Sequence, residues 1–506
     1  MFRKVLIANR GEIACRIART LRAMDVKSVA IASEADRGAL HTRVADEAIV
    51  VGGPEPRASY LDVDAIVRAA KASGAEAVHP GYGFLAENAA FAAAVEAAGL
   101  TFIGPTAEQI GAMGDKRAAR AAAIAAGVPV VPGAEGRDPA ALAAAAARLG
   151  FPVIVKAALG GGGKGMRVVE DVAALGEAIE GAARLARSGF GDDAVYVERR
   201  LDRVHHVEVQ IAGDGRGDAI HLFERDCSLQ RRHQKVIEES PSPAVDEPLR
   251  ARLTAAAVAL ARAIRYRGLG TMEFLVAGGG AKAAGGEAAL YFLEMNTRLQ
   301  VEHPVTETIT GLDLVRMQLE IAATGVLPLA QDAVTRRGHA IEARVYAEDA
   351  AKNFLPQTGR AVKVRWPEGV RVDAGIESGD SVPVHYDPIL AKVIVTGASR
   401  DQALARLADA LDASVVHGVI TNLPFLRALV RARAVERAAI DTEWIEREFL
   451  AGFAALATAP APELALAAAA LGERLGIPAP DRARAPAPRR AALFAALGRW
   501  RLPGLE

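Results

Sequence analysis

The chain has 506 residues, 51% of them hydrophobic, and its 61 Lys and Arg residues balance its 61 Asp and Glu residues. This length and composition predict about two to four domains with apolar cores, and the balanced charge argues against a nucleic-acid or membrane-surface partner. Cys15 and Cys227 are too few for a disulfide framework, no apolar run approaches a membrane span of ~20 residues, and the N-terminus lacks the apolar core of a signal peptide. We therefore expect a soluble, cytoplasmic protein.

Short apolar strands alternate with amphipathic helices over residues 1–112, which predicts a parallel sheet built from βαβ units. Strands are expected at 5–8, 29–32, 77–79 and near 101, and a helix from Gly11 places Ile13, Ile17, Leu21 and Met24 on one stripe. The turn at 9–13 lacks G-x-G-x-x-G, which disfavours a dinucleotide site. The glycine-containing loop 79–88 is typical either of close approach to a ligand or of an ordinary tight turn.

A glycine-rich segment is the main feature of residues 113–203. Helices are predicted over 113–127 and 134–150, and a strand over 152–156 ends in Lys156. Four consecutive glycines follow at 160–163; they cannot pack a core, so they favour a loop that wraps phosphate oxygens or a flexible linker. The loop is not a Walker A motif, because Lys164 is followed by glycine. Lys156 favours phosphate binding, because a buried lysine needs an anion.

Two hairpins are expected between 194 and 296, after a strand at 194–198. The first pairs 207–211 with 219–223, and the second pairs 271–275 with 291–296. The dense basic stretch 226–235 between them is interpreted, in isolation, as a solvated loop. The second hairpin places Glu273 and Glu294 on neighbouring strands, a plausible Mg²⁺–nucleotide site.

A row of polar residues follows the apolar run 289–293. If the chain stays extended, Glu294, Asn296, Arg298, Gln300 and Glu302 all face one way. A carboxylate and an amide suit Mg²⁺, and a guanidinium suits a carboxylate-like anion. The alternative is a solvated edge strand with mixed charges.

After Pro328 the predicted elements become short. Strands are expected at 340–346, 362–364, 370–372, 382–384 and 392–395, and a helix at 401–413. They indicate an α+β region whose small antiparallel sheet packs beside the catalytic sheet. Residues 451–506 are rich in Ala, Pro and Arg and are typical of a helix followed by a linker.

Several motifs, in this order and spacing, resemble those of biotin carboxylases, members of the ATP-grasp superfamily. They are ANRGEIA at 8–14, HPGYGFLAEN at 79–88, MGDK at 113–116, GGGGKGM at 160–166, ERDCSLQRRHQK at 224–235 and EMNTRLQVEHPVTE at 294–307. The likeness runs from residue 1 to about 447 and is greatest to the biotin carboxylase part of an acyl-CoA carboxylase alpha subunit. It implies a multidomain α/β and α+β fold: a Rossmann-like domain at 1–112, an ATP-grasp domain at 113–330 with a mobile lid at about 131–203, a C-terminal α+β domain at 331–447, and a helix and linker at 448–506.

The resemblance implies that ATP phosphorylates bicarbonate to carboxyphosphate, whose CO₂ is captured by N1 of biotin on a separate carrier domain. ATP would be held by Lys116, Lys156, Gly160, Gly161, Gly162, Gly163, Lys164, Gly165, Glu198, Arg199, Leu201, His206, Gln230, His233 and Leu275. Two Mg²⁺ (or Mn²⁺) ions would be held by Glu273, Glu294 and Asn296. Bicarbonate would be held by Lys235, Arg298, Gln300 and the Val301 backbone. Glu302 would deprotonate bicarbonate, acting with the catalytic residues Arg298, Lys235 and Arg344, while Arg344 and Tyr82 would contact biotin.

Some residues depart from the family pattern, and other functions remain open. Val204-His205 and Arg199-Arg200 replace residues usual in the family near the lid and the adenine pocket, which concerns nucleotide affinity rather than the reaction. The alternatives are the corresponding part of a pyruvate or urea carboxylase, a carboxylate–amine ATP-grasp ligase, and a silent scaffold subunit. A carrier domain and a carboxyltransferase subunit are expected partners, in a homodimer or a larger hetero-oligomer. No Met-Lys-Met biotin site is present, so the sequence predicts either truncation before a carrier domain or a split gene.

Overall fold

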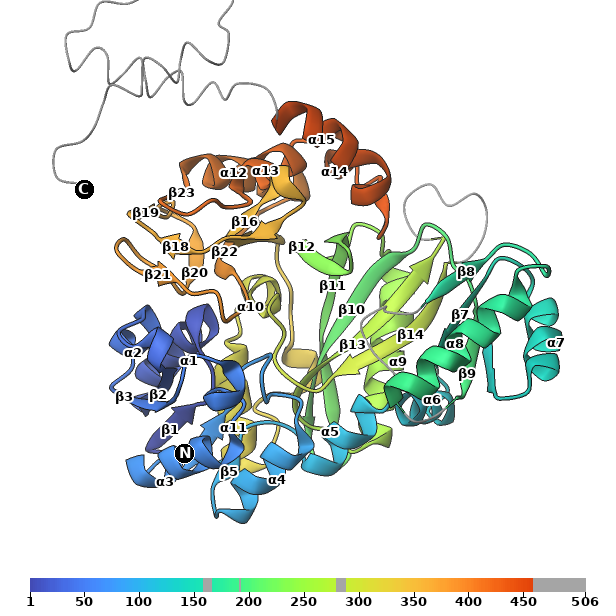
Figure 1. Ribbon diagram of the computed structural model, residues 1–506. Helices are drawn as coiled ribbons and strands as arrows, with labels where there is room; N and C mark the ends of the chain where they lie inside the picture. Colours follow the sequence, from blue (N-terminus) through green and yellow to red (C-terminus); the bar gives the residue numbers. More distant parts are fainter. Residues whose placement is uncertain (158–165, 191–192, 279–287, 458–506) are drawn as a thin grey trace, which may run out of the picture. The chain divides into compact units, whose positions relative to one another are not determined.

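The computed structural model describes residues 1–157, 166–190, 193–278 and 288–457. The chain divides into two compact units, residues 1–450 and 451–506. Only 451–457 of the second unit are described, as part of helix α15 (Leu450–Ala457). The first unit confirms the expected mixture of a parallel α/β sheet with α+β regions (Figure 1).

The N-terminal sheet is parallel throughout, as predicted. Its strands are β1 (Lys4–Ile7), β2 (Lys27–Ser33), β3 (Glu47–Gly52), β4 (Ala77–His79) and β5 (Thr101–Phe102), in the order β3-β2-β1-β4-β5. Helix α1 (Gly11–Ala23) buries the predicted stripe except at Met24, which caps the helix and is partly exposed. The other helices are α2 (Leu40–Val44), α3 (Val63–Ser73) and α4 (Ala89–Ala97). The sequence did not reveal β3, because this edge strand has no buried residue.

A second, four-stranded antiparallel sheet follows helices α5 (Ala107–Gly114) and α6 (Lys116–Ala125). Its order is β6-β9-β7-β8, with β6 (Gly133–Gly136), β7 (Val153–Ala157), β8 (Arg167–Val169) and β9 (Val195–Arg199). Helices α7 (Pro139–Leu149) and α8 (Leu175–Phe190) pack on it. The predicted helix 134–150 was too long at its start, because its first residues form β6 and Asp138 caps α7.

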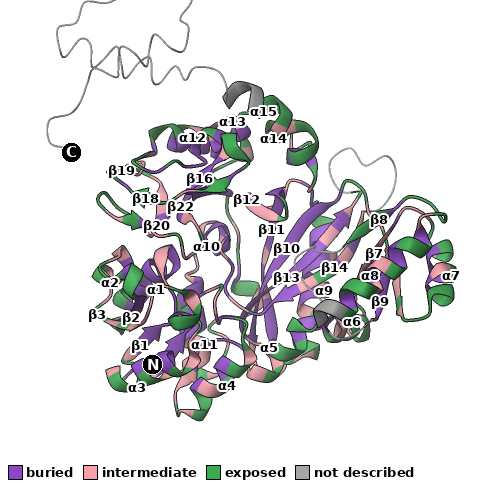
Figure 2. Ribbon diagram, in the orientation of Figure 1, coloured by how far each residue is buried: buried purple, intermediate pink, exposed green. Residues whose placement is uncertain are grey.

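The third sheet has eight strands in the order β14-β13-β10-β11-β12-β15-β22-β20. They are β10 (His205–Asp214), β11 (Ala219–Arg231), β12 (Gln234–Ser240), β13 (Arg267–Ala277), β14 (Ala289–Asn296), β15 (His339–Tyr346), β20 (Arg371–Ala374) and β22 (Ile389–Gly397). Both predicted hairpins are present, as β10–β11 and β13–β14. Figure 2 shows β10, β11 and β13 to be largely buried.

Two sequence interpretations of this region were wrong. The stretch 226–235 is not a solvated loop: it forms the end of β11, a turn and the start of β12, and its residues 226–231 are buried. Three strands after Pro328, β15, β20 and β22, do not lie in a separate sheet either: β12 pairs with β15 through Ile237–Ala343 to Ser240–Ala340, so they extend the central sheet. The predicted strands 362–364 and 382–384 correspond to β19 and β21, which lie in separate two-stranded antiparallel sheets. The alternation of apolar residues predicts a strand but does not identify the neighbour it pairs with.

Smaller elements complete the first unit. Helix α9 (Glu247–Ala263) packs on one face of the eight-stranded sheet, with α10 (His303–Thr310) and α11 (Leu314–Thr324) elsewhere in the core. The short strands are β16 (Glu348–Asp349), β17 (Leu355–Pro356), β18 (Gly359–Arg360), β19 (Lys363–Arg365), β21 (Ser381–Val382) and β23 (Val415–His417). The predicted helix 401–413 is α12 (Arg400–Ala413), followed by α13 (Leu423–Val430), α14 (Arg433–Glu436) and a π-helical turn at Ile445–Phe449.

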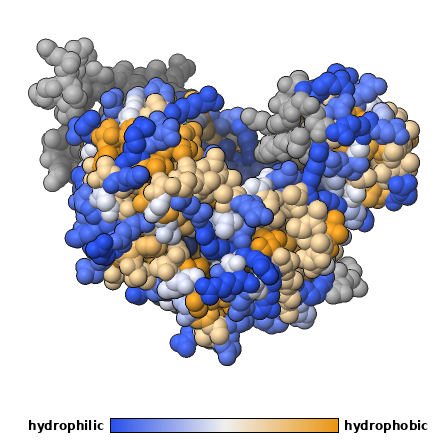
Figure 3. Space-filling view, turned by 90° about the horizontal axis from the view of Figure 1, so that it is seen from below, coloured by the Kyte–Doolittle hydropathy of each residue, from blue (hydrophilic) through white to orange (hydrophobic). Residues whose placement is uncertain are grey.

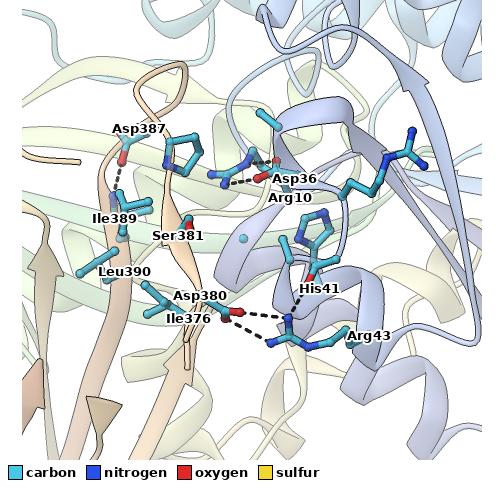
Figure 4. A pocket seen from close by; sticks show the side chains of 18 of the residues that line it. Arg10, Asp36, His41, Arg43, Ile376, Asp380, Ser381, Asp387, Ile389 and Leu390 are labelled. Carbon is cyan, nitrogen blue, oxygen red and sulfur yellow. Dashed lines mark hydrogen bonds and ion pairs between the residues drawn. The ribbon is translucent and has the colours of Figure 1, made fainter. Parts of the chain in front are cut away.

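Polar contacts join the N-terminal sheet to the segment 375–390. A cavity of about 330 Å³ lies between them. In its wall, Arg10 pairs with Asp36 at 2.6 Å, and Arg43 pairs with Asp380 at 2.9 Å (Figure 4). The guanidinium groups of these two arginines are therefore neutralised within the protein.

No described helix has the length and apolar character needed to cross a membrane. On the face shown in Figure 3, apolar patches alternate with polar side chains.

Candidate active site

One face of the eight-stranded sheet is polar because its side chains alternate. On β10, Val207, Val209 and Ile211 pack into the core beneath α9, so Glu208 and Gln210 face the opposite side. The register places Glu294, Glu273, Glu208 and Arg225 side by side across β14, β13, β10 and β11. Adjacent strands thus carry a row of three acids and one cation.

Lys235 on β12 contacts two acids of this row and also Glu302. Its Nζ atom is 2.5 Å from Glu208 Oε2, 2.8 Å from Glu273 Oε1 and 2.6 Å from Glu302 Oε1. Burial alone would lower the pKa of the ammonium, but the surrounding acidic groups raise it well above its usual value. Lys235 is therefore a permanent cation that holds three carboxylates together.

Glu302 is fully buried and paired on both carboxylate oxygens. Lys235 donates to Oε1, and Arg344 Nη2 donates to Oε2 at 3.0 Å. Burial would raise the pKa of Glu302, but these two cations hold it well below its usual value. Arg344 is itself oriented by Glu238, whose Oε1 accepts from Arg344 Nε at 2.5 Å. The pairing leaves Glu302 ionised at neutral pH.

The chain does not stay extended along 294–302, so the prediction that five side chains share one strand face was wrong. Strand β14 ends at Asn296, the next five residues form no helix or strand, and Glu302 is the N-cap of α10. The side chains nevertheless converge. Asn296 and Gln300 both donate to Glu273 Oε1, at 2.8 and 3.1 Å, and Arg298 donates to the side-chain oxygens of both at 3.0 Å.

The proposed metal ligands lie together but play different electrostatic roles. Glu273 and Glu294 are directly opposite on β13 and β14. Burial would raise the pKa of Glu273, but Lys235 and His206, whose Nε2 is 2.8 Å from Glu273, hold it well below its usual value. Burial and Glu273 raise the pKa of Glu294, and its nearest cation, Lys116, is 3.8 Å away. The negative charge of Glu294 is therefore poorly compensated, and a hard cation such as Mg²⁺ would stabilise it, with oxygens of Glu273 and Asn296 beside it.

Some of the tightest clusters of ligand atoms differ from the predicted metal set. In the described part of the chain, ligand atoms gather within 4.8 Å of one another in His206, Glu208 and Glu273, and in Glu208, Cys227 and Glu302. Glu273 is the one acid of the predicted set that belongs to these groups of His, Cys, Asp and Glu in the described residues, and it also accepts from Lys235.

The residues predicted to bind nucleotide are distributed over several elements. Lys156 on β7 pairs with Glu198 on β9 at 2.7 Å, and Arg199 and Leu201 lie at and just after the end of β9. His206 is opposite Leu275, and Gln230 is opposite Lys235. His233 lies in the β11–β12 turn with a positive φ of 64°. Gly160 to Gly165, including Lys164, lie outside the described residues.

Tyr82, predicted to flank biotin, donates its hydroxyl to Glu12 in the first turn of α1. In the loop that carries it, Gly81 has a φ of +65°, and a side chain there would approach the Asn9 amide to 2.9 Å. Gly81 therefore packs closely against Asn9, and the two interpretations of the loop stay predictions.

Sequence reasoning missed several charged residues behind the site. Glu208, Arg225, Glu238 and Lys392 are buried, and Glu87 accepts from Arg298 Nε at 2.9 Å. A signal existed for Glu208, because Glu208 and Gln210 alternate with apolar residues in a strand that sits within the chain's core.

Arg225 is fully buried and is expected to be a main stabiliser of this face. It donates to Glu208 at 2.6 Å, Gln210 at 2.7 Å, and Thr306 and Thr271 at 3.0 Å. We expect Arg225→Met to lower the free energy of unfolding in urea by about 3–5 kcal/mol, because a buried acid loses its partner. Arg262→Met, which removes an exposed pair with Asp218, is the control and should cost about 1 kcal/mol or less. Equal losses in the two variants would contradict this role.

Comparison with known proteins agrees with this architecture. The biotin carboxylase N-terminal domain family matches residues 1–110, the ATP-binding domain of the carbamoyl-phosphate synthase L chain matches 115–330, and the biotin carboxylase C-terminal domain matches 342–447. A solved structure, the biotin carboxylase domain of Hydrogenobacter thermophilus 2-oxoglutarate carboxylase with MgADP, ADP and bicarbonate, is similar at a TM-score of 0.81 and 40% identity. That similarity covers 88% of this chain and 97% of that one.

Two curated relatives show how much of a longer protein the chain represents. It is 50% identical over 449 residues to the mitochondrial methylcrotonoyl-CoA carboxylase subunit alpha of Oryza sativa, covering 88% of this chain but 60% of that protein. It is 48% identical over 453 residues to the biotin carboxylase of Pseudomonas aeruginosa, covering 88% of this chain and 99% of that protein. Because the match to the bacterial protein spans nearly its whole length, this chain belongs to the biotin carboxylase family.

Proposed function

We propose that the chain is an ATP-dependent biotin carboxylase, which carboxylates N1 of biotin on a carrier domain and releases ADP and phosphate. The observation that carries the proposal is the buried carboxylate of Glu302, held between Lys235 and Arg344 beside the Arg298–Gln300 pair. This arrangement places a carboxylate that can act as a general base next to cationic side chains that can bind a planar anion such as bicarbonate.

In the proposed reaction, Arg298, Gln300, Lys235 and the Val301 backbone hold bicarbonate in line with the γ-phosphate. Glu302 accepts the bicarbonate proton while a bicarbonate oxygen bonds to the γ-phosphorus and the bond to ADP breaks. Carboxyphosphate then divides into CO₂ and phosphate, and the phosphate takes the biotin N1 proton. Arg344 stabilises the developing enolate oxygen, Tyr82 flanks the ring, and N1 bonds to CO₂.

The nucleotide would lie between the four-stranded sheet and the polar face of the eight-stranded one. We assign its binding to Lys116, Lys156, Gly160, Gly161, Gly162, Gly163, Lys164, Gly165, Glu198, Arg199, Leu201, His206, Gln230, His233 and Leu275. Glu273, Glu294 and Asn296 would hold Mg²⁺ or Mn²⁺, which neutralises phosphate charge when bound. Residues 131–203 would act as a lid that excludes water from carboxyphosphate, within an ATP-grasp domain at 113–330 between domains at 1–112 and 331–447.

This activity would be the first half-reaction of an acyl-CoA carboxylase, in the cytoplasm. A biotin carrier domain and a carboxyltransferase subunit are the proposed partners, in a homodimer or a larger hetero-oligomer. The support for the half-reaction and its partners is the sequence identity with a relative named as a mitochondrial methylcrotonoyl-CoA carboxylase subunit alpha, while the cytoplasmic location rests on the sequence alone.

ATP hydrolysis by the purified chain tests the proposal. We expect hydrolysis that requires bicarbonate and Mg²⁺ and is stimulated by free biotin. A folded protein that binds ATP but shows no bicarbonate-dependent hydrolysis would instead fit a scaffold subunit, and hydrolysis dependent on an amine would indicate a carboxylate–amine ligase.

Glu273→Gln is expected to lower bicarbonate-dependent ATP hydrolysis by about 10²-fold and to raise the Mg²⁺ concentration that gives half-maximal activity, because it removes a charged metal ligand. The measurement is a Mg²⁺ titration of the hydrolysis rate at saturating ATP and bicarbonate. Glu76→Gln is the control, since Glu76 pairs with an exposed arginine on the N-terminal sheet. An unchanged Mg²⁺ requirement in Glu273→Gln would remove Glu273 from the metal site.

A further inference from the structure

Lys392 on β22 is a fully buried lysine whose two closest polar partners come from distant parts of the chain. Its Nζ atom donates to the Val301 carbonyl at 2.7 Å and lies 3.3 Å from Glu12 Oε1. In the sheet it stands between Arg344 on β15 and Asp373 on β20. A buried ammonium is costly unless it is paired, so these partners indicate what the residue does.

The contact with Val301 acts on Glu302. The carbonyl of Val301 and the amide of Glu302 belong to one planar peptide group. A lysine that fixes this carbonyl therefore also fixes the plane from which Glu302 enters α10. The segment between β14 and α10 is irregular, so it has no regular ladder or helix to hold its direction.

The contact with Glu12 acts on Tyr82. Glu12 Oε1 accepts the Tyr82 hydroxyl, and Lys392 Nζ is 5.9 Å from the centre of the Tyr82 ring. Burial raises the pKa of Glu12 to about 7, although Lys392 pulls it down. Without Lys392, this carboxylate would therefore take up a proton more readily and would hold the hydroxyl of Tyr82 less firmly.

We propose that Lys392 is a positioning residue that joins the two halves of the site. Through the Val301 peptide it aims the base Glu302, and through Glu12 it sets the position of Tyr82 at the biotin subsite. This assignment rests on the proposed function. Under this assignment, three segments act together in the site. They are strand β22, the loop 297–301 and the first turn of α1.

The test is the double variant Lys392→Met with Glu12→Gln, which removes both buried charges together and so avoids an unpaired acid. We expect the KM for bicarbonate to rise about 10-fold and the rate with free biotin to fall about 10-fold, while the Kd for ATP stays within about twofold. Lys392→Arg should recover part of the bicarbonate effect, because it keeps the charge and a donor. The control is Arg250→Met with Glu224→Gln, a buried pair at 2.8 Å between helix α9 and strand β11 of the same sheet.

Hydrogen exchange gives a readout that does not depend on activity. We expect faster amide exchange over 297–303 in the Lys392 and Glu12 double variant but not in the control. Unchanged amide exchange over 297–303 in the Lys392 and Glu12 double variant would overturn the positioning role. So would a loss of rate that is equal in this variant and in the control, with the KM for bicarbonate unchanged in both. A wild-type chain without bicarbonate-dependent hydrolysis would overturn the proposed function alone, because the exchange result would still decide whether Lys392 orders the loop.

Discussion

Replacing Glu302 with glutamine is expected to lower bicarbonate-dependent ATP hydrolysis by about 10³-fold while leaving the Kd for ATP within about twofold. A positioned general base contributes about 10²–10⁴-fold, and an amide of the same shape cannot accept the bicarbonate proton. The amide oxygen can still accept a hydrogen bond from Lys235 or from Arg344, but not from both, because the amide nitrogen is a donor. The substitution keeps the shape of the side chain, so the nucleotide contacts should stay in place. Steady-state hydrolysis and nucleotide titration measure the two quantities.

Glu307→Gln is the matched control. Glu307 is a buried acid in the same helix, paired with Arg16 at 2.6 Å and outside the bicarbonate contacts. Its loss should affect stability but not the requirement for bicarbonate. If both variants keep wild-type hydrolysis, Glu302 is not the base.

The depressed pKa of Glu302 has consequences for pH dependence. Its folded pKa lies below the unfolded value of about 4.3, so its ion pairs contribute stability that is complete above that pH and is lost as pH falls through the folded pKa. A carboxylate held so low is a weak base in the free enzyme. Bound phosphates and bicarbonate would share the charge of Lys235 and Arg344, which raises the pKa of Glu302. We therefore expect the acid limb of kcat to lie at higher pH than that of kcat/KM.

Local sequence patterns predicted most helices and strands well. They did not predict which strands pair when those strands are far apart in the sequence. Turn chemistry identified the β10–β11 hairpin. The two strand-like runs on either side of the glycine-rich stretch 278–286 indicated the β13–β14 hairpin, and with it the opposition of Glu273 and Glu294. Nothing in the stretch 236–240 indicated that it would pair with 340–343, because an apolar strand pairs equally well with many partners. The residue roles rested on the resemblance to biotin carboxylases rather than on periodicity.

Buried charges were the main failure of the sequence analysis. The stretch 226–235 was interpreted as solvated because it is dense in basic residues, yet Arg231 pairs with Glu348 inside the protein and Lys235 with three acids. The partners lie far away in sequence, so their compensation cannot be seen locally. Lys392, within an otherwise apolar strand, is the same case.

Lys235→Met is expected to lower the free energy of unfolding by about 3–5 kcal/mol at pH 8 and to abolish hydrolysis, because three buried carboxylates lose their shared cation. Burial and Glu302 already raise the pKa of Glu208, and removing Lys235 would raise it further. An acid with a raised folded pKa destabilises the protein as pH rises through that value, so the variant should recover more stability than the wild type as pH falls from 8 to 5. Urea unfolding across that range is the measurement.

A second substitution separates this charge effect from lost packing. Lys235→Met with Glu208→Gln removes one acid together with the cation, and about half of the lost stability should return without activity. Lys27→Met, which removes an exposed ion pair with Asp46 at 3.1 Å, is the control and should change stability by about 1 kcal/mol or less at every pH. If the loss in Lys235→Met were independent of pH and unrelieved by Glu208→Gln, the lysine would contribute packing alone. The recovery expected here would instead show that the acids proposed to bind metal and to activate bicarbonate coexist in one buried face because Lys235 neutralises them.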